Sequence, residues 1–380
     1  MPTEMIDDLR ARFLTAIEAI KKQAQASTLL RNDFALCPPS VDGNFRVLAI
    51  GKASRTMMDA VLAEFGNRIE SGLCIGQNKD DSISSDWVSY MSGEHPVPGS
   101  HSFLAGREAI DFARSARKDG AAVVALLSGG ASSLCEWPAA GHTREELVGV
   151  HRRAISAGLA IESINEQRAQ VSAVKGGGLA DLLGSSLVDV RVLVDIPTGD
   201  IDVVGSGPFD SAAFCGVKRA IGSPNDLITM AEHAFAPLSI TRVNACSWEL
   251  ARLSELMVQH AIGGHGLWVT AGEVGVALPS GLLAQREGGR AQHLALTVAR
   301  KLDAITRPWA IATWASDGCD GKGGSGAIIT SLDRPKLLEE EASAALKDWQ
   351  SGSYLSRIGC RLNSFASETN LTDLYMVLCA

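Results

Sequence analysis

The stretch "AAVVALLSGGASSLCEW" at residues 121–137 decides the fold class of this chain. Its first seven residues are an unbroken apolar run, which is typical of a strand buried on both faces of a parallel sheet. Two glycines and three serines end the run, and residues 143–163 then show the apolar spacing of a helix. The stretch therefore predicts an α/β protein with this strand in a parallel sheet.

The turn after this strand is the first candidate binding site, because ligands of open parallel sheets bind at the carboxyl ends of the strands. Gly129 and Gly130 would let the backbone come close to a ligand. Hydroxyl groups are offered by Ser128, Ser132 and Ser133. We expect an anionic small molecule here, although an ordinary tight strand exit explains these residues about as well.

Apolar runs alternate with helical patterns along the first half of the chain. Strands are expected at residues 45–51, 72–76, 87–91, 121–127 and 188–195, and helices at 53–66, 101–117 and 143–163. This alternation predicts a parallel sheet with helices on both faces. From about residue 240 the pattern changes to short strand-like runs with one strong helix at 289–306, which predicts a second, mixed-sheet domain. Residues 210–240 show no obvious strand, so we expect domains at 1–238 and 239–380.

Composition excludes several classes of protein. The net charge is −8 and no basic block occurs, so nucleic acid is not expected as a main partner. The eight cysteines are scattered without a CxxC pair, which disfavours a zinc site or a disulfide framework and suits the cytoplasm. The N-terminus lacks the pattern of a signal peptide, and no apolar run approaches a membrane span.

Two nucleotide-binding motifs fail on their context. "AIGKAS" at residues 49–54 has a Gly-Lys pair, but Arg46 stands where a P-loop needs glycine. "GKGGSG" at residues 321–326 matches G-x-G-x-x-G, yet it precedes a strand-like run rather than a helix. A P-loop and a dinucleotide fingerprint are therefore both rejected.

Basic residues beside glycine loops are candidates for binding an anion. Lys52 follows a strand and precedes a helix, a position that disfavours lysine unless an anion is nearby; an exposed lysine is the alternative. Arg168 and Lys175 would share one helix face, and Lys175 enters a triple glycine that begins at Gly176. An anion clamp and a solvated helix explain that spacing equally well. His95, in the proline-bounded loop "GEHPVPGSHS", is interpreted as a loop-packing residue.

Carboxylates and one further arginine occupy similar places. Asp195 ends a strand and Asp200 follows it in the loop, where carboxylates suit Mg²⁺. Arg290 is expected to open the helix at 289–306, beside N–H groups that also favour an anion. Asp317 lies in an Asp-Gly loop, although such pairs are also common turn formers.

These pieces, in this order, resemble the class II glycerate kinases, whose C-terminal part is the MOFRL domain and whose members are often labelled hydroxypyruvate reductase. The resemblance covers nearly the whole chain. It is carried by "GKAS", "GEHPVPGSHS", "SGGASSL", "IESINEQRAQVSAVKGGGLA", "VDIPTGDIDVVGSGPFD", "GGRAQHLAL", "SDGCDGKGGSGAII" and "ETNLTD".

The resemblance implies a Rossmann-like N-terminal domain, a mixed α/β MOFRL domain and an active site in the cleft between them. It implies ATP- and Mg²⁺-dependent phosphorylation of glycerate or a related sugar acid, with the 2-hydroxyl as the expected acceptor. The implied catalytic residues are Lys52, Asp195, Asp200 and Arg290, with Asp195 and Asp200 also at the metal. The implied binding residues are Ser128, Gly129, Gly130, Ser132, Arg168, Lys175, Gly176, Asp317 and Asn370.

Departures from the family pattern concern the acceptor. Ala131 replaces a glycine, and Ala291 and His293 replace an asparagine and a glutamate, so we expect the last two to alter acceptor choice. The glycine-rich turn before Asn370 is also lost.

A nicotinamide-dependent hydroxypyruvate reductase and a non-catalytic sugar-acid or nucleotide-binding relative remain alternatives. Small molecules are the expected partners, and a homodimer would be unsurprising.

Overall fold

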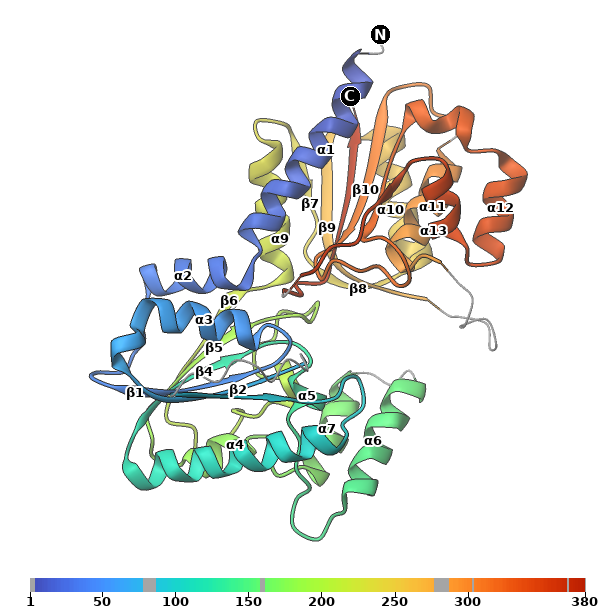
Figure 1. Cartoon of the computed structure of the whole chain (residues 1–380). Coiled ribbons are helices and arrows are strands. Elements are labelled where there is room, and N and C mark those ends of the chain that lie inside the picture. The colour runs from blue at the N-terminus through green and yellow to red at the C-terminus, as the bar shows by residue number, and fades with distance from the viewer. Residues whose placement is uncertain are drawn as a thin grey trace. The chain divides into compact units, whose positions relative to one another are not determined.

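A computed structural model describes residues 4–77, 87–157, 161–276, 287–302, 304–367 and 369–379. The chain divides into two compact units (Figure 1). The parallel-sheet unit comprises residues 26–195 and 200–222, and the mixed-sheet unit comprises residues 1–25, 196–199 and 223–380.

The parallel-sheet unit is built on six parallel strands in the order β3-β2-β1-β4-β5-β6. The strands are β1 (Phe45–Ile50), β2 (Ile69–Gly76), β3 (Val88–Ser92), β4 (Ala122–Leu127), β5 (Val188–Leu193) and β6 (Gly216–Gly222). The helices are α2 (Ala26–Leu36), α3 (Ser54–Phe65), η1 (Gly66–Arg68), α4 (Ser100–Asp119), α5 (Ala131–Leu134), α6 (Arg144–Ala157), α7 (Ile161–Val171), α8 (Gly178–Leu183) and η2 (Val204–Ser206). Figure 1 shows α2 and α3 on one face of the sheet and α4 on the other, which confirms the predicted layers.

The predicted strands and long helices occur in the predicted order, but strand β6, helix α2 and the short helices α5 and α8 were not predicted. Strand β6 was missed because it is an edge strand whose residues are mostly exposed, so it carries no apolar run. The helix predicted at 143–163 is divided between α6 and α7, and residues 158–160 lie outside the described residues.

The described residues of the mixed-sheet unit form a sheet of seven strands. Their order is β12-β11-β10-β13-β9-β7, and β8 also pairs with β9. The strands are β7 (Ile240–Arg242), β8 (Cys246–Glu249), β9 (Gly266–Gly275), β10 (Trp309–Ala315), β11 (Gly326–Thr330), β12 (Arg361–Leu362) and β13 (Asp373–Cys379). The helices are α1 (Glu4–Gln23), α9 (Pro224–Phe235), α10 (Leu250–Gly263), α11 (Arg290–Lys301), η3 (Ser331–Lys336), α12 (Glu339–Lys347) and α13 (Ser351–Arg357). Strands β7 and β8 run parallel to β9, and the other pairs are antiparallel, as a mixed sheet requires.

The domain boundary differs from the expected one at residue 238. Helix α1 and residues 223–238 belong to the mixed-sheet unit. The reason is tertiary: α1 packs on α9, with the rings of Phe13 and Phe235 5.0 Å apart, and both helices lie against strands of the mixed sheet. In the described part of the chain, no helix combines the length and the apolar character that a membrane span needs.

Candidate functional site

The turns that end β1 and β4 are joined to each other. The Lys52 N–H donates to the carbonyl of Gly129 (2.8 Å), and the Ala53 N–H donates to Oγ of Ser128 (3.1 Å). A Cβ at Gly51, whose φ is +128°, would lie 2.2 Å from that hydroxyl oxygen. Because β1 and β4 are neighbouring parallel strands, the fold brings Lys52 to the turn at residues 128–130.

Both glycines of this turn are closely approached by functional side chains. A Cβ at Gly129 would lie 1.9 Å from Oδ2 of Asp195, which follows β5. A Cβ at Gly130 would lie 3.0 Å from Cγ of Lys52 and 3.4 Å from Cδ2 of His95. Three strand exits therefore place Lys52, Asp195 and His95 around one backbone segment, which only glycine leaves open.

His95 is the residue that the sequence interpretation passed over as a loop-packing group. Its neighbour Glu94 accepts hydrogen bonds from the N–H groups of Ser102 (2.9 Å) and His101 (3.2 Å) at the start of α4. Although burial opposes ionisation of Glu94, these bonds lower its pKa to about 2. Burial, followed by the positive charges of Lys52 and Arg168, lowers the pKa of His95 to about 4. His95 is therefore a neutral imidazole beside two cations.

Arg168 lies in the last turn of α7 and is the third basic group here. Burial lowers its pKa, against the opposing charge of Glu136. Its Nε is buried and has no hydrogen-bond partner among the described residues. A buried donor without a partner is costly, so Arg168 is suited to an anionic ligand.

Lys175 is placed differently from the prediction. Helix α7 ends at Val171, so Arg168 and Lys175 do not share a helix face. The side chain of Lys175 is buried, with Nζ 3.0 Å from Oε2 of Glu136, and it donates to the carbonyl of Cys135 (3.2 Å). Lys175 is thus paired inside the protein rather than presented to a ligand.

Glu136 was not predicted, although a carboxylate directly after a buried strand and its turn is an unusual feature of the sequence. It also contacts Nε2 of His151 (3.2 Å) and accepts a hydrogen bond from Ser172.

Of the remaining predicted residues, Ser132 is half-buried in α5, and Gly176 is exposed with a φ of +55°.

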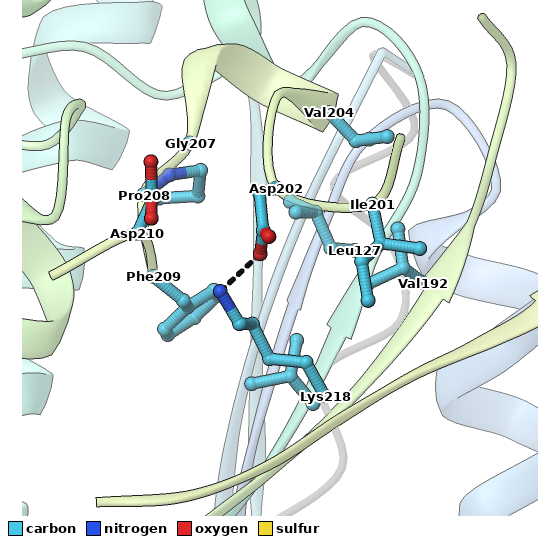
Figure 2. Close-up of a pocket in the computed structure, with 11 residues that line it drawn as sticks. Leu127, Val192, Ile201, Asp202, Val204, Gly207, Pro208, Phe209, Asp210 and Lys218 are labelled. Atoms are coloured by element: carbon cyan, nitrogen blue, oxygen red, sulfur yellow. Dashed lines mark hydrogen bonds and ion pairs between the residues drawn. The ribbon is translucent and has the colours of Figure 1, made fainter. Parts of the chain in front are cut away.

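The loop after β5 contains the second predicted metal ligand. Asp200 is exposed, and its Oδ1 accepts a hydrogen bond from the N–H of Asp202 (2.9 Å). Asp202 forms an ion pair with Lys218 of β6 beside Leu127 and Val192 (Figure 2). In the described residues no three His, Cys, Asp or Glu side chains are grouped to hold a metal ion.

Arg290 opens α11 in the mixed-sheet unit, as predicted, but it is already paired. Its Nη2 lies 3.1 Å from Oε1 of Glu273, and its Nε lies 3.2 Å from Oδ2 of Asp373. Although burial opposes its charge, Asp373 and Glu273 raise the pKa of Arg290. Burial raises the pKa of Asp373 to about 7, with Arg290 opposing the shift.

The amino end of α11 does not offer the free donors that we expected. Asp320 accepts hydrogen bonds from the N–H groups of Ala291 (3.0 Å) and Gln292 (2.7 Å). A carboxylate of the protein thus occupies the place predicted for a ligand anion. The adjoining pocket has a volume of about 280 Å³ and is acidic; its polar lining includes Glu273, Arg290, Asp317, Asp320, Asn370 and Asp373.

Asp317 and Asn370 line this pocket, and each also closes its own turn. Asp317 Oδ1 accepts from the N–H of Cys319, and Asn370 Oδ1 accepts from the N–H of Thr372, both at 3.0 Å. The expectation that Ala291 and His293 choose the acceptor finds no support. Ala291 is fully buried, and the His293 ring stacks on Trp349 at 4.0 Å.

Comparison with known proteins agrees with this architecture. Residues 8–214, more than half of the chain, match a family described as a domain of unknown function, DUF4147, and residues 266–373 match the MOFRL family. The chain belongs to the DUF4147 family. With the MOFRL match, this confirms membership of the class II glycerate kinase family that the sequence motifs indicated.

Several relatives of this class II glycerate kinase family member match it over most of its length. A D-glycerate 2-kinase from Thermotoga maritima is 26% identical, over 96% of this chain and 97% of that protein. A protein from Agrobacterium vitis, named provisionally as a hydroxypyruvate reductase, is also 26% identical, over 88% of this chain and 99% of its own. A crystal structure of a glycerate kinase from Thermotoga maritima shares the fold, with a TM-score of 0.86 and 21% identity over 98% of this chain and 100% of that one.

The fold of this family member also bears on the rejected dinucleotide motif. "GKGGSG" lies between β10 and β11, which are antiparallel neighbours. A dinucleotide fingerprint instead requires a strand, a turn and a helix in a parallel βαβ unit. The rejection of this motif is therefore confirmed.

Proposed function

We propose that this protein is an ATP-dependent kinase that phosphorylates glycerate at the 2-hydroxyl group to give 2-phosphoglycerate. The observation that carries the proposal is the cluster at the carboxyl edge of the parallel sheet, where Lys52 and Arg168 form no ion pair with any described residue. Phosphoryl transfer requires alignment of the reactants and neutralisation of charge more than covalent help. The kinases among the relatives support glycerate as the acceptor.

Each residue of the cluster has a role that follows from its chemistry. Lys52 would neutralise charge on the transferring phosphoryl group or hold the carboxylate of the acid. Gly129 and Gly130 would let backbone groups reach a ligand. The carboxylate of Asp195, held against Gly129, suits Mg²⁺, which is commonly bound by one or two carboxylates together with substrate phosphates.

Mg²⁺ bound at Asp195 would supply neutralisation of the phosphate charge. Asp200 is less well placed for this role, because it is exposed and its Oδ1 already accepts a backbone hydrogen bond. Arg290 would have to exchange Glu273 or Asp373 for the anion that it is proposed to bind. We therefore assign the first contact with the anionic substrates to the parallel-sheet unit.

The test is to measure ADP formation from ATP, with and without Mg²⁺, across a panel of hydroxy acids, and to identify the phosphorylated product by NMR. We expect turnover with glycerate and formation of 2-phosphoglycerate. Lys52→Ala should reduce turnover by roughly two to three orders of magnitude if Lys52 stabilises charge in the transition state. Lys118→Ala, at the exposed end of α4, is the matched control. Oxidation of a nicotinamide by hydroxypyruvate without ADP formation from glycerate would overturn the proposal.

A further inference from the structure

We infer that His95, Lys52 and Arg168 form one oxyanion subsite, and that binding of the oxyanion favours the protonated form of His95. The inference deepens the proposed function and rests on it for the choice of ligand, which is the carboxylate of the acceptor acid or a phosphate of ATP. It concerns only side chains of the parallel-sheet unit.

The glycine turn holds two of these side chains together. Gly130 has a φ of +82°, and Lys52 and His95 both approach the position that its side chain would take. Any other residue at 130 would be strained and would crowd Lys52, which a Cβ would meet at 3.0 Å. The Lys52 side chain, through Cγ and Cε, and the imidazole ring of His95 therefore both lie against this glycine.

The loop that carries His95 is anchored on both sides. The Gly93 N–H donates to the carbonyl of Gly76 (2.9 Å), and a Cβ at Gly93 would lie 2.1 Å from the carbonyl oxygen of Leu134. Glu94 directs its carboxylate to the start of α4, where it accepts the bonds from His101 and Ser102. The half-buried imidazole of His95 is thus positioned by a fixed backbone.

Arg168 brings a donor that the described residues leave unpaired. Its Nε is buried and finds no hydrogen-bond partner in the part of the chain that the structure describes. The carboxylate that acts on its charge is Glu136, and that carboxylate already pairs with Lys175 and contacts His151. Because the single negative charge of Glu136 is shared between Lys175 and Arg168, positive charge remains that an oxyanion can neutralise.

The charges around His95 determine whether oxyanion binding raises or lowers its pKa. The positive charges of Lys52, in the turn after β1, and of Arg168, on α7, both act on His95. The carboxylate of Asp195 approaches the neighbouring Gly129, and that of Glu94 is directed to the start of α4. Burial, and after it these two cations, holds the pKa of His95 at about 4. An oxyanion between them would oppose their charges and raise this pKa. By linkage, oxyanion affinity should then increase as pH falls toward the pKa of the free protein.

NMR of the intact chain labelled at histidine tests this directly, with the His95 signals assigned by their loss in His95→Asn. The pKa of His95 is measured in the free protein, with D-glycerate and with ATP. We expect a rise of about one unit or more with the ligand whose oxyanion occupies the subsite, and none with the other. In the free protein Lys52→Met and Arg168→Gln should each raise the pKa, and Arg107→Gln, on the exposed face of α4, should not.

Calorimetry shows whether each ligand is bound during these titrations. The subsite would be overturned if the pKa of His95 changes with neither bound D-glycerate nor bound ATP. It would also be overturned if neither Lys52→Met nor Arg168→Gln changes this pKa in the free protein. The kinase assay separates the two proposals. A shift with D-glycerate but no ADP would remove the proposed activity and leave the subsite, whereas ADP formation with an unmoved His95 would remove the subsite alone.

Discussion

Glu136 and Lys175 form a buried ion pair, with Oε2 and Nζ 3.0 Å apart and both side chains almost fully excluded from solvent. Glu136 lies just after α5, and Lys175 begins the glycine-rich turn that leads to α8. The pair therefore connects two segments of the proposed site. The pair also holds the Lys175 side chain inside the protein, where it is not presented to an anionic ligand.

Removing the negative member of this pair should destabilise the fold. Glu136→Gln leaves the Lys175 ammonium buried without a counter-charge, and breaking a buried pair in this way costs about 3–5 kcal/mol. Urea unfolding should show a lower free energy of unfolding, with little change for Glu145→Gln on the exposed side of α6. Equal stability of the two variants would mean that the pair contributes nothing to the fold.

The pH dependence of stability should contain a contribution from His293. Burial lowers its pKa to about 4, so the unfolded chain binds the proton more readily than the folded one. The contribution of this group is complete above the unfolded pKa, near 6.5, and is lost as pH falls toward about 4. His293→Phe keeps a ring against Trp349 without titrating, so its loss of stability between pH 7 and 4.5 should be smaller by roughly 1–3 kcal/mol.

Thermal or urea unfolding of both proteins across this pH range makes the comparison. The decisive quantity is the slope of the free energy of unfolding against pH. The substitution also removes the contact between His293 Nδ1 and the Ser351 hydroxyl, which changes stability at every pH. Identical slopes would show that His293 is protonated as easily in the folded protein as in the unfolded chain.

If Arg290 exchanges Glu273 or Asp373 for the anionic group of a substrate, Arg290→Lys should impair activity although it conserves the charge. The guanidinium reaches Glu273 and Asp373 with different nitrogens, and a single ammonium cannot reproduce this forked geometry. We expect kcat/KM for the acceptor to fall by about tenfold or more. Arg252→Lys, an exposed arginine of α10, is the control, and wild-type kcat/KM in Arg290→Lys would make Arg290 a structural ion-pair residue only.

Gly129→Ala tests the approach of Asp195 to the turn. The new methyl group would lie 1.9 Å from Oδ2 of Asp195, so the carboxylate or the turn must move. We expect a loss of about 1–3 kcal/mol in stability together with a strong fall in turnover. Gly66→Ala is the matched control, because no described residue beyond its chain neighbours comes within 4 Å of its Cβ position and its φ is negative. Full activity in Gly129→Ala would show that Asp195 is not held in a working position by this turn.

Local patterns in the sequence were sufficient to predict the parallel sheet and the turn at its carboxyl edge. The run at residues 121–127 is apolar because β4 is buried on both faces, and the glycines after it are required where Asp195, Lys52 and His95 approach the backbone. Both signals are properties of a few consecutive residues. They can therefore be recognised without knowledge of the rest of the chain.

Only the tertiary structure decided which charged groups are available to a ligand. Lys175 and Arg290 resemble anion-binding residues in sequence, but Glu136 in one case and Glu273 with Asp373 in the other neutralise them across long stretches of chain. Packing likewise placed α1 against α9. It also placed β6 at the edge of the sheet, where its exposed residues form no apolar run from which a strand could be predicted. Such pairings depend on distances between segments remote in sequence, and residue type and local spacing do not encode those distances.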